Sequence, residues 1–144
     1  MIEQDSVKLL RECDAGVKMG VDSIEQVMPY VRSQALRESL GKCKGEHEKL
    51  EKELRGLLHR YGDEGKKPNP VAKTMSHMKT NMRLGLHHAD STIADLMSDG
   101  CHMGVKSLNR YLNQYKAADE VSKDITKRLI NQEEQLAVEI RGFL

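Results

Sequence analysis

The arrangement of this chain is decided by a long interruption between two pairs of helical segments, YGDEGKKPNPVAKTMSHMKTNMRLGLHHAD at residues 61–90. Its first part, residues 61–70, combines glycine, lysine and two prolines, a composition that breaks helices. Residues 71–88 return to a helical spacing and predict a short amphipathic helix. A connection of roughly thirty residues is too long for a tight turn. The long helices before and after it are therefore not partners in one hairpin.

Four long helices are predicted on the two sides of this interruption. Apolar residues recur at spacings of three and four, and strand signals are lacking, over residues 6–28, 33–61, 91–116 and 118–143. Pro29 marks the end of the first helix, Gly62 fits the cap that ends the second, and Ser91 fits the cap that begins the third. Glu51 and Arg55 fit a solvent-facing pair one turn apart.

Two short-looped hairpins joined by one long crossover predict an all-α fold. The expected architecture is an antiparallel four-helix bundle with a short extra helix in the crossover between the second and third long helices. A length of 144 residues suits one domain, so residues 1–144 are expected to form a single bundle.

Composition argues against several classes of function. The 23 Lys and Arg residues nearly balance 22 Asp and Glu residues, and aromatic residues make up only 3% of the chain. Neither a basic field nor stacking surfaces are present for nucleic acid. No apolar run approaches the ~20 residues of a membrane span, and the N-terminus lacks the apolar segment of a signal peptide. Three widely spaced cysteines favour a reducing, cytoplasmic setting.

Each predicted core stripe is interrupted near its centre by a polar residue or a cysteine. In chain order the interruptions are Asp14, Cys43, His47, Cys101 and Gln132, with Glu133 beside the last. If the first hairpin turns near Val31, a rise of ~1.5 Å per residue places Asp14 and His47 at one level. The same count from the second turn places Cys101 level with Gln132.

This layer of polar residues has two interpretations. Carboxylate, imidazole and thiolate are all ligands of zinc or iron. A metal site for iron, zinc or manganese would use Asp14, His47 and Cys101, completed by Glu46, Glu133 or Cys43. The alternative, which we favour, is a hydrogen-bonded layer that fixes helix register, with the cysteines acting as small apolar side chains.

The segments CDAGVKMG (13–20), GEHEKL (45–50), MSDGCHMGVKSL (97–108) and NQEEQL (131–136) carry the central polar residues of the four helices. Together with the hairpin–crossover–hairpin pattern, they resemble the ferritin-like superfamily, and small bacterial members of about this length. Di-iron members supply Glu-x-x-His from two of the helices. This chain has Glu46-x-x-Lys49 and Gln132-x-x-Gln135 instead, so di-iron oxidation chemistry is not expected.

The expected function is that of a non-catalytic structural or interaction protein that self-associates as a homodimer. The alternative is a metal-binding protein or metalloenzyme using the Asp/His/Cys site. A third, weaker reading starts from four helix-interior glycines, Gly16, Gly20, Gly100 and Gly104. Each costs about 1 kcal/mol relative to alanine, so either close helix packing or space for a small ligand is expected beside them.

Overall fold

The computed structural model describes residues 2–86 and 89–144, which form an all-α fold. Four long helices build the bundle: α1 (Ile2–Val27), α2 (Gln34–Arg60), α4 (Asp90–Gln114) and α5 (Glu120–Ile140). The short helix α3 (Pro70–Leu86) lies in the crossover, and 3-10 turns at Met28–Tyr30 and Arg141–Phe143 follow α1 and α5. The predicted four-helix bundle with a short helix in the crossover is confirmed.

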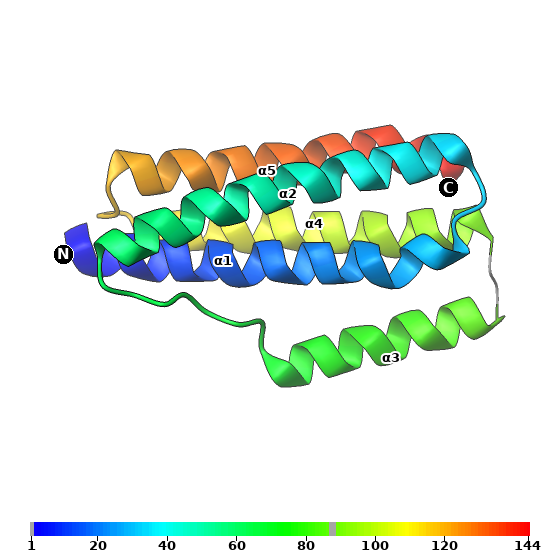
Figure 1. The fold of residues 1–144 in the computed structure, drawn as a ribbon, viewed down its shortest axis with the longest axis horizontal. Helices are drawn as coiled ribbons and strands as arrows, with labels where there is room; N and C mark the ends of the chain where they lie inside the picture. The colour runs from blue at the N-terminus through cyan, green and yellow to red at the C-terminus, as the bar shows by residue number, and fades with distance from the viewer. Residues whose placement is uncertain (1, 87–88) are drawn as a thin grey trace.

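The crossover sets the directions of the four long helices (Figure 1). α1 and α2 form one antiparallel hairpin, and α4 and α5 form the other. Because the crossover returns along the whole bundle, α4 begins at the end where α2 begins. α2 and α4 therefore run in the same direction, while each long helix packs against antiparallel neighbours.

Two of the three predicted helix-end residues lie where a helix ends, since Pro29 is in the 3-10 turn after α1 and Gly62 follows α2. Ser33 caps α2, since its side chain accepts a hydrogen bond from the backbone N–H of Leu36. Gly62 follows α2 with a φ of 72°, the left-handed conformation of a glycine cap. The prediction for Ser91 is wrong, because α4 begins one residue earlier, after Ala89.

Asp90 ties the start of α4 to the start of α2. Its two carboxylate oxygens accept hydrogen bonds of 2.8 Å from the backbone N–H groups of Arg32 and Ser33. An anion at the N-terminal end of a helix is favoured by the exposed N–H groups and the helix dipole. Asp90 therefore closes one end of the bundle.

Most predicted helix bounds shift by a few residues. α1 begins at Ile2 instead of residue 6, and Pro29 lies in the 3-10 turn that continues α1. α3 runs to Leu86, whereas its predicted end at His88 lies outside the described residues. α4 and α5 each stop short of the predicted end, and the 3-10 turn after α5 reaches Phe143.

The bundle interior contains two apolar clusters separated along its length. One cluster includes Leu36, Leu40, Ile93 and Ile140, near the end where α2 and α4 begin. The other includes Leu10, Leu54, Leu58, Ile125 and Leu129, near the end where α5 begins. Among the described residues, no helix is long and apolar enough to cross a membrane.

α3 lies outside the bundle alongside α1 and is attached mainly by polar contacts (Figure 1). Its His77 pairs with Asp22 of α1, and Gln26 of α1 donates hydrogen bonds to the His77 carbonyl and the Asn81 side chain. Leu84 is the apolar anchor, buried against the bundle. The α3 part of the crossover thus runs along the outer side of α1.

Candidate functional site

The buried polar layer is built around His47 of α2 and Glu133 of α5. His47 is 1% exposed, and its Nε2 lies 2.9 Å from Oε1 of Glu133. Its Nδ1 faces the Sγ atom of Cys43, one helical turn earlier, at 3.7 Å. Both ring nitrogens therefore face a partner inside the bundle, and the pair lies between the two apolar clusters.

His47 holds its proton at neutral pH. Burial disfavours the imidazolium, but the hydrogen bonds with Cys43 and Glu133, together with the negative charge of Glu133, outweigh burial and raise the pKa of His47 from 6.5 to about 10. His47 and Glu133 consequently form a buried ion pair. A histidine in this state is neither a general base nor a metal ligand, because both roles need a free nitrogen lone pair.

Two buried thiols, Cys101 in the layer and Cys13 in the apolar cluster with Leu10, are held in the protonated form. Burial, followed by the charge of Glu133 and a hydrogen bond with it, raises the pKa of Cys101 far above its ordinary value. Burial raises the pKa of Cys13 to about 12, although its contact of 3.2 Å with the Thr126 hydroxyl works in the opposite direction. Thiolates are the nucleophiles and metal ligands, so these two thiols behave as small apolar groups with a weak donor.

Of the four glycines singled out in α1 and α4, two lie beside the ion pair. A Cβ atom on Gly20 would lie 3.0 Å from Cδ2 and 3.1 Å from Nε2 of His47. A Cβ atom on Gly104 would lie 3.5 Å from the carboxyl carbon of Glu133, an ordinary contact. Gly16 and Gly100 have no described atom within 4 Å of that position. Close approach therefore explains Gly20 most clearly.

Asp14 belongs to a different group of residues from His47. Its fully buried Oδ2 atom accepts hydrogen bonds of 2.8 Å from the Lys18 ammonium and from the backbone N–H of Lys66 in the crossover. Gly65 passes so close that a Cβ atom there would lie 2.4 Å from Oδ2. Asp14 thus anchors the first part of the crossover onto α1.

The predicted level of Asp14 and His47 fails because the turn is displaced. His47 lies beside Gly20, six residues beyond Asp14 along α1, which corresponds to about 9 Å of helix. The 3-10 turn at Met28–Tyr30 prolongs α1 with a larger rise per residue, and residues 31–33 then join it to α2, so the hairpin turns later than Val31. Counting residues along both helices from the hairpin turn is a valid way to find facing residues, but the turn lies later in the chain than Val31.

Glu51 is the residue of this region that the sequence pattern misplaced. The pairing with Arg55 one turn later predicts that Glu51 faces solvent. In the structure Glu51 is only 8% exposed and lies next to Asp14. Burial, then the hydrogen bond and the charge shared with Asp14, raise the pKa of Glu51 to about 7, while Lys18 and Arg55 lower it. Glu51 lies one turn after His47 on the same face of α2, and this spacing from a core residue indicates that Glu51 is buried.

The predicted metal ligands are brought together only in part. Four side chains converge on the layer: Cys43, His47, Cys101 and Glu133. Asp14 lies in the crossover group, and Glu46 lines a small cleft of about 10 Å³ between α2 and α5 that Cys43 and Gln132 also border. Within residues 2–86 and 89–144, no three His, Cys, Asp or Glu side chains are grouped closely enough to hold one ion.

Comparison of the chain with protein-family models, with curated proteins and with solved structures finds no match in any of the three.

Proposed function

We propose that this protein is a non-catalytic, ferritin-like helical bundle that serves as a structural or interaction protein. The observation that carries the proposal is the engagement of both His47 ring nitrogens, by Glu133 and by Cys43. A charged histidine with no free lone pair can act neither as a general base nor as a metal ligand, and here its two N–H groups face Glu133 and Cys43 inside the bundle.

The role of the layer is to select one pairing of the helices. His47 and Glu133 lie between two apolar clusters, so sliding α5 past α2 by one turn would leave two charges against apolar side chains. An unpaired charge in such surroundings costs several kcal/mol. A register error is therefore disfavoured far more strongly than it would be in a uniformly apolar core.

The directions of the helices support the ferritin-like assignment. The first hairpin is followed by a crossover along the full bundle and then by a second hairpin (Figure 1). Bundles of the ferritin-like type have this single long crossover, whereas simple up-down-up-down bundles have only short loops.

A double-mutant cycle tests the structural role. His47→Leu or Glu133→Leu alone leaves the other buried group unpaired and is expected to cost about 3–5 kcal/mol of unfolding free energy in urea. The double variant is expected to regain most of that loss, because two leucines can pack together. If the single losses are below about 0.5 kcal/mol, or simply add in the double variant, the pair does not have this role.

A metal-binding function is the second candidate, favoured by one observation. Nitrogen, sulfur and oxygen donors from α2, α4 and α5 converge on the layer as His47, Cys43, Cys101 and Glu133. As they stand, no three of these side chains are grouped closely enough to hold one ion, so binding of zinc, iron or manganese would need the side chains to move closer as well as release of protons from His47 and the thiols. Metal binding would then be coupled to proton release.

Elemental analysis distinguishes the two candidates. The untagged protein, purified without chelator, is measured for metal per chain and then titrated with zinc. Near-stoichiometric metal that is lost in His47→Gln would support the metal site. Metal-free protein that also takes up no added zinc would support the structural layer.

The remaining proposals concern partner and compartment. A homodimer is the expected assembly, and sedimentation equilibrium over a tenfold concentration range tests it. A cytoplasmic location agrees with three cysteines that are all free and buried, Cys13, Cys43 and Cys101.

A further inference from the structure

Asp14 and Glu51 form a buried pair of carboxyl groups beneath the crossover. Asp14 on α1 is fully buried, Glu51 on α2 is more than nine-tenths buried, and the two side chains are hydrogen-bond partners. Among the residues that the structure describes, Oδ1 of Asp14 and both oxygens of Glu51 find no N–H or O–H donor. Buried polar groups normally have hydrogen-bond partners. A hydrogen carried by one carboxyl group and donated to the other would supply the missing donor.

The neighbouring cations compensate only one of the two carboxylates. The Lys18 ammonium lies 2.8 Å from Oδ2 of Asp14 but 3.9 Å from Oε1 of Glu51. Arg55 lies 3.4 Å from the same Glu51 oxygen, but its side chain is mostly exposed, which weakens this pairing. Three further charged residues from α2 and the crossover lie near the pair: Glu48, Lys66 and Lys67. Burial and the charge of Asp14 accordingly raise the pKa of Glu51 to about 7.

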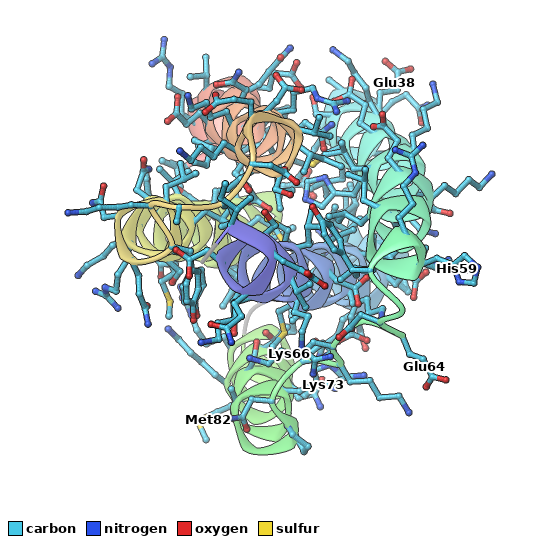
Figure 2. The ribbon with its side chains drawn as sticks, turned by 90° about the vertical axis from the view of Figure 1, so that its left-hand side faces the viewer. Glu38, His59, Glu64, Lys66, Lys73 and Met82 are labelled. Carbon is cyan, nitrogen blue, oxygen red and sulfur yellow. The ribbon has the colours of Figure 1, made fainter. Side chains whose placement is uncertain are left out.

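The first part of the crossover covers this pair. The backbone N–H of Lys66 donates a hydrogen bond of 2.8 Å to Oδ2 of Asp14, and Gly65 lies directly against the same oxygen. The Lys66 ammonium pairs with Glu12 of α1 at 2.5 Å. Figure 2 shows the labelled Lys66 on the side of α1 that faces α3. If this segment moved away, water would reach both carboxyl groups.

Other ion pairs hold the crossover farther along α1. Asp22 pairs with His77 of α3, and also with Lys73 at 3.8 Å. Glu25 pairs with Lys44 of α2 at 3.3 Å. These two carboxylates thus have close cations of their own. His77 is itself titratable, so an effect of Glu51 has to be measured at the Lys66 end of the crossover and not along α3.

We propose that Asp14 and Glu51 share one proton, and that this proton fastens the crossover onto α1. With the proton in place, the O–H of one carboxyl group donates to the other, and Oδ2 of Asp14 still accepts the N–H of Lys66. When the proton passes to water, two carboxylates face each other in buried surroundings. Opening of the crossover then relieves the repulsion, because water solvates both charges. The crossover is therefore a pH-sensitive cover over the side of α1.

The direction and size of the effect follow from the pKa of Glu51 in the two states. The closed crossover holds this pKa at about 7, and exposure to water returns it toward the ordinary value of 4.5. The open state therefore loses its proton first as the pH rises. The equilibrium constant for opening increases between these two values and levels off above about pH 7. We expect opening to be about tenfold to a hundredfold more frequent at pH 8 than at pH 5.

Hydrogen exchange of the Lys66 amide in the full chain measures this opening from pH 5 to 8, with each rate divided by the intrinsic rate at that pH. The reference is the Ser33 amide, which donates to Asp90 over the same 2.8 Å at the other end of the bundle (Figure 1). An equal rise at Ser33 would overturn the proposal, because the cause would then be general. Equal opening constants at Lys66 and at Leu54 in the bundle interior would also overturn it, because the crossover would then open only with the whole bundle.

Glu51→Gln is the decisive variant, since its amide group has the shape of a protonated glutamate and donates to Asp14 at every pH. The Lys66 opening constant should then stay near its pH 5 value. Glu48→Gln is the matched control, because Glu48 is an exposed carboxylate of α2 that borders the same groove of about 630 Å³, and it should leave the rise intact. An undiminished rise in Glu51→Gln would refute the proposal.

A second measurement needs no variant and decides if Glu51→Gln does not fold. The carboxyl carbon of Glu51 in the unmodified, ¹³C-labelled chain is followed from pH 3 to 9. A titration midpoint near 7, where the rise at Lys66 levels off, would support the shared proton. A midpoint near 4.5, the ordinary value, would refute it.

Discussion

His47 Nε2 lies 2.9 Å from Glu133 Oε1 across the contact between α2 and α5, in a layer with apolar clusters on both sides. A shift of helix register would therefore move these charges against apolar side chains. Gly20 on α1 lies against the imidazole ring and Gly104 on α4 lies near the carboxyl group. All four long helices therefore contribute to the surroundings of one pair.

The first prediction concerns stability at alkaline pH. The pKa of His47 is raised from 6.5 to about 10 in the folded protein, so between these values the folded state keeps a proton that the unfolded chain has released. Its stabilising contribution is complete below about pH 6.5 and is lost as the pH rises toward 10. Urea unfolding of the unmodified protein and of His47→Gln should give a difference in free energy that shrinks by a few kcal/mol over this window.

A difference that is constant from pH 6.5 to 10 would show that His47 is not held in the charged state. The control is His59→Gln, a histidine exposed at the end of α2. Because this side chain is exposed, His59→Gln should change the free energy of unfolding little throughout the series.

The second prediction compares two glycines on the same helix. Gly20→Ala places a methyl group 3.0 Å from the His47 ring and should destabilise the protein by about 1–3 kcal/mol, because the ring must shift from Glu133. Gly16→Ala meets open space and should stabilise it by about 1 kcal/mol. Thermal or urea unfolding of both variants measures the contrast. Equal stabilisation by both would mean that α1 does not approach the ring so closely.

The third prediction concerns Glu51 in the acidic range. Its pKa is raised from 4.5 to about 7, so the folded state binds a proton more tightly than the unfolded chain does. The contribution of Glu51 to stability should therefore fall as the pH rises from about 4.5 to 7. Glu51→Gln removes this fall and is expected to be more stable than the unmodified protein at pH 8 by about 1–3 kcal/mol. A destabilised Glu51→Gln at pH 8 would contradict the account.

The fourth prediction uses two glycines that share a left-handed conformation. Gly62 has a φ of 72° and Gly65 a φ of 93°, so alanine at either position carries a backbone cost of about 1–2 kcal/mol. Only Gly65→Ala also drives a methyl group into Asp14 Oδ2, at 2.4 Å, whereas Gly62 has no described atom within 4 Å. Gly65→Ala should therefore destabilise more and should speed proteolysis of the crossover. Equal effects would mean that the crossover is not held on Asp14.

The fold could be predicted from the sequence because its signals are local. Helical spacing, the prolines and the long break at residues 61–90 each depend on neighbouring residues, and together they define two hairpins and a crossover. The cap expected at Ser91 failed because Asp90 is engaged by backbone N–H groups at the start of α2. That contact joins distant parts of the chain and leaves no local trace.

The candidate site could be predicted only as a set of residues. The sequence identified Cys43, His47 and Cys101 as interruptions of the core stripes, with Glu133 beside the interruption at Gln132, and the structure gathers Cys43, His47, Cys101 and Glu133. The sequence could not give the level of Asp14 relative to His47. If the hairpin turn shifts by two or three residues along the chain, the residue on α1 that faces His47 changes by more than one helical turn. Glu51 was missed because a glutamate–arginine pair one turn apart is typical of an exposed face, and burial by the crossover is not encoded in α2 itself.

The most direct test of the structural role is the ¹⁵N spectrum of the His47 imidazole at pH 8, recorded before and after one equivalent of zinc. We predict two protonated ring nitrogens, with shifts that zinc does not change, because Glu133 holds the imidazolium in place. A neutral ring at pH 8, or a ring nitrogen that shifts on zinc binding, would contradict the account and favour a metal site in the layer.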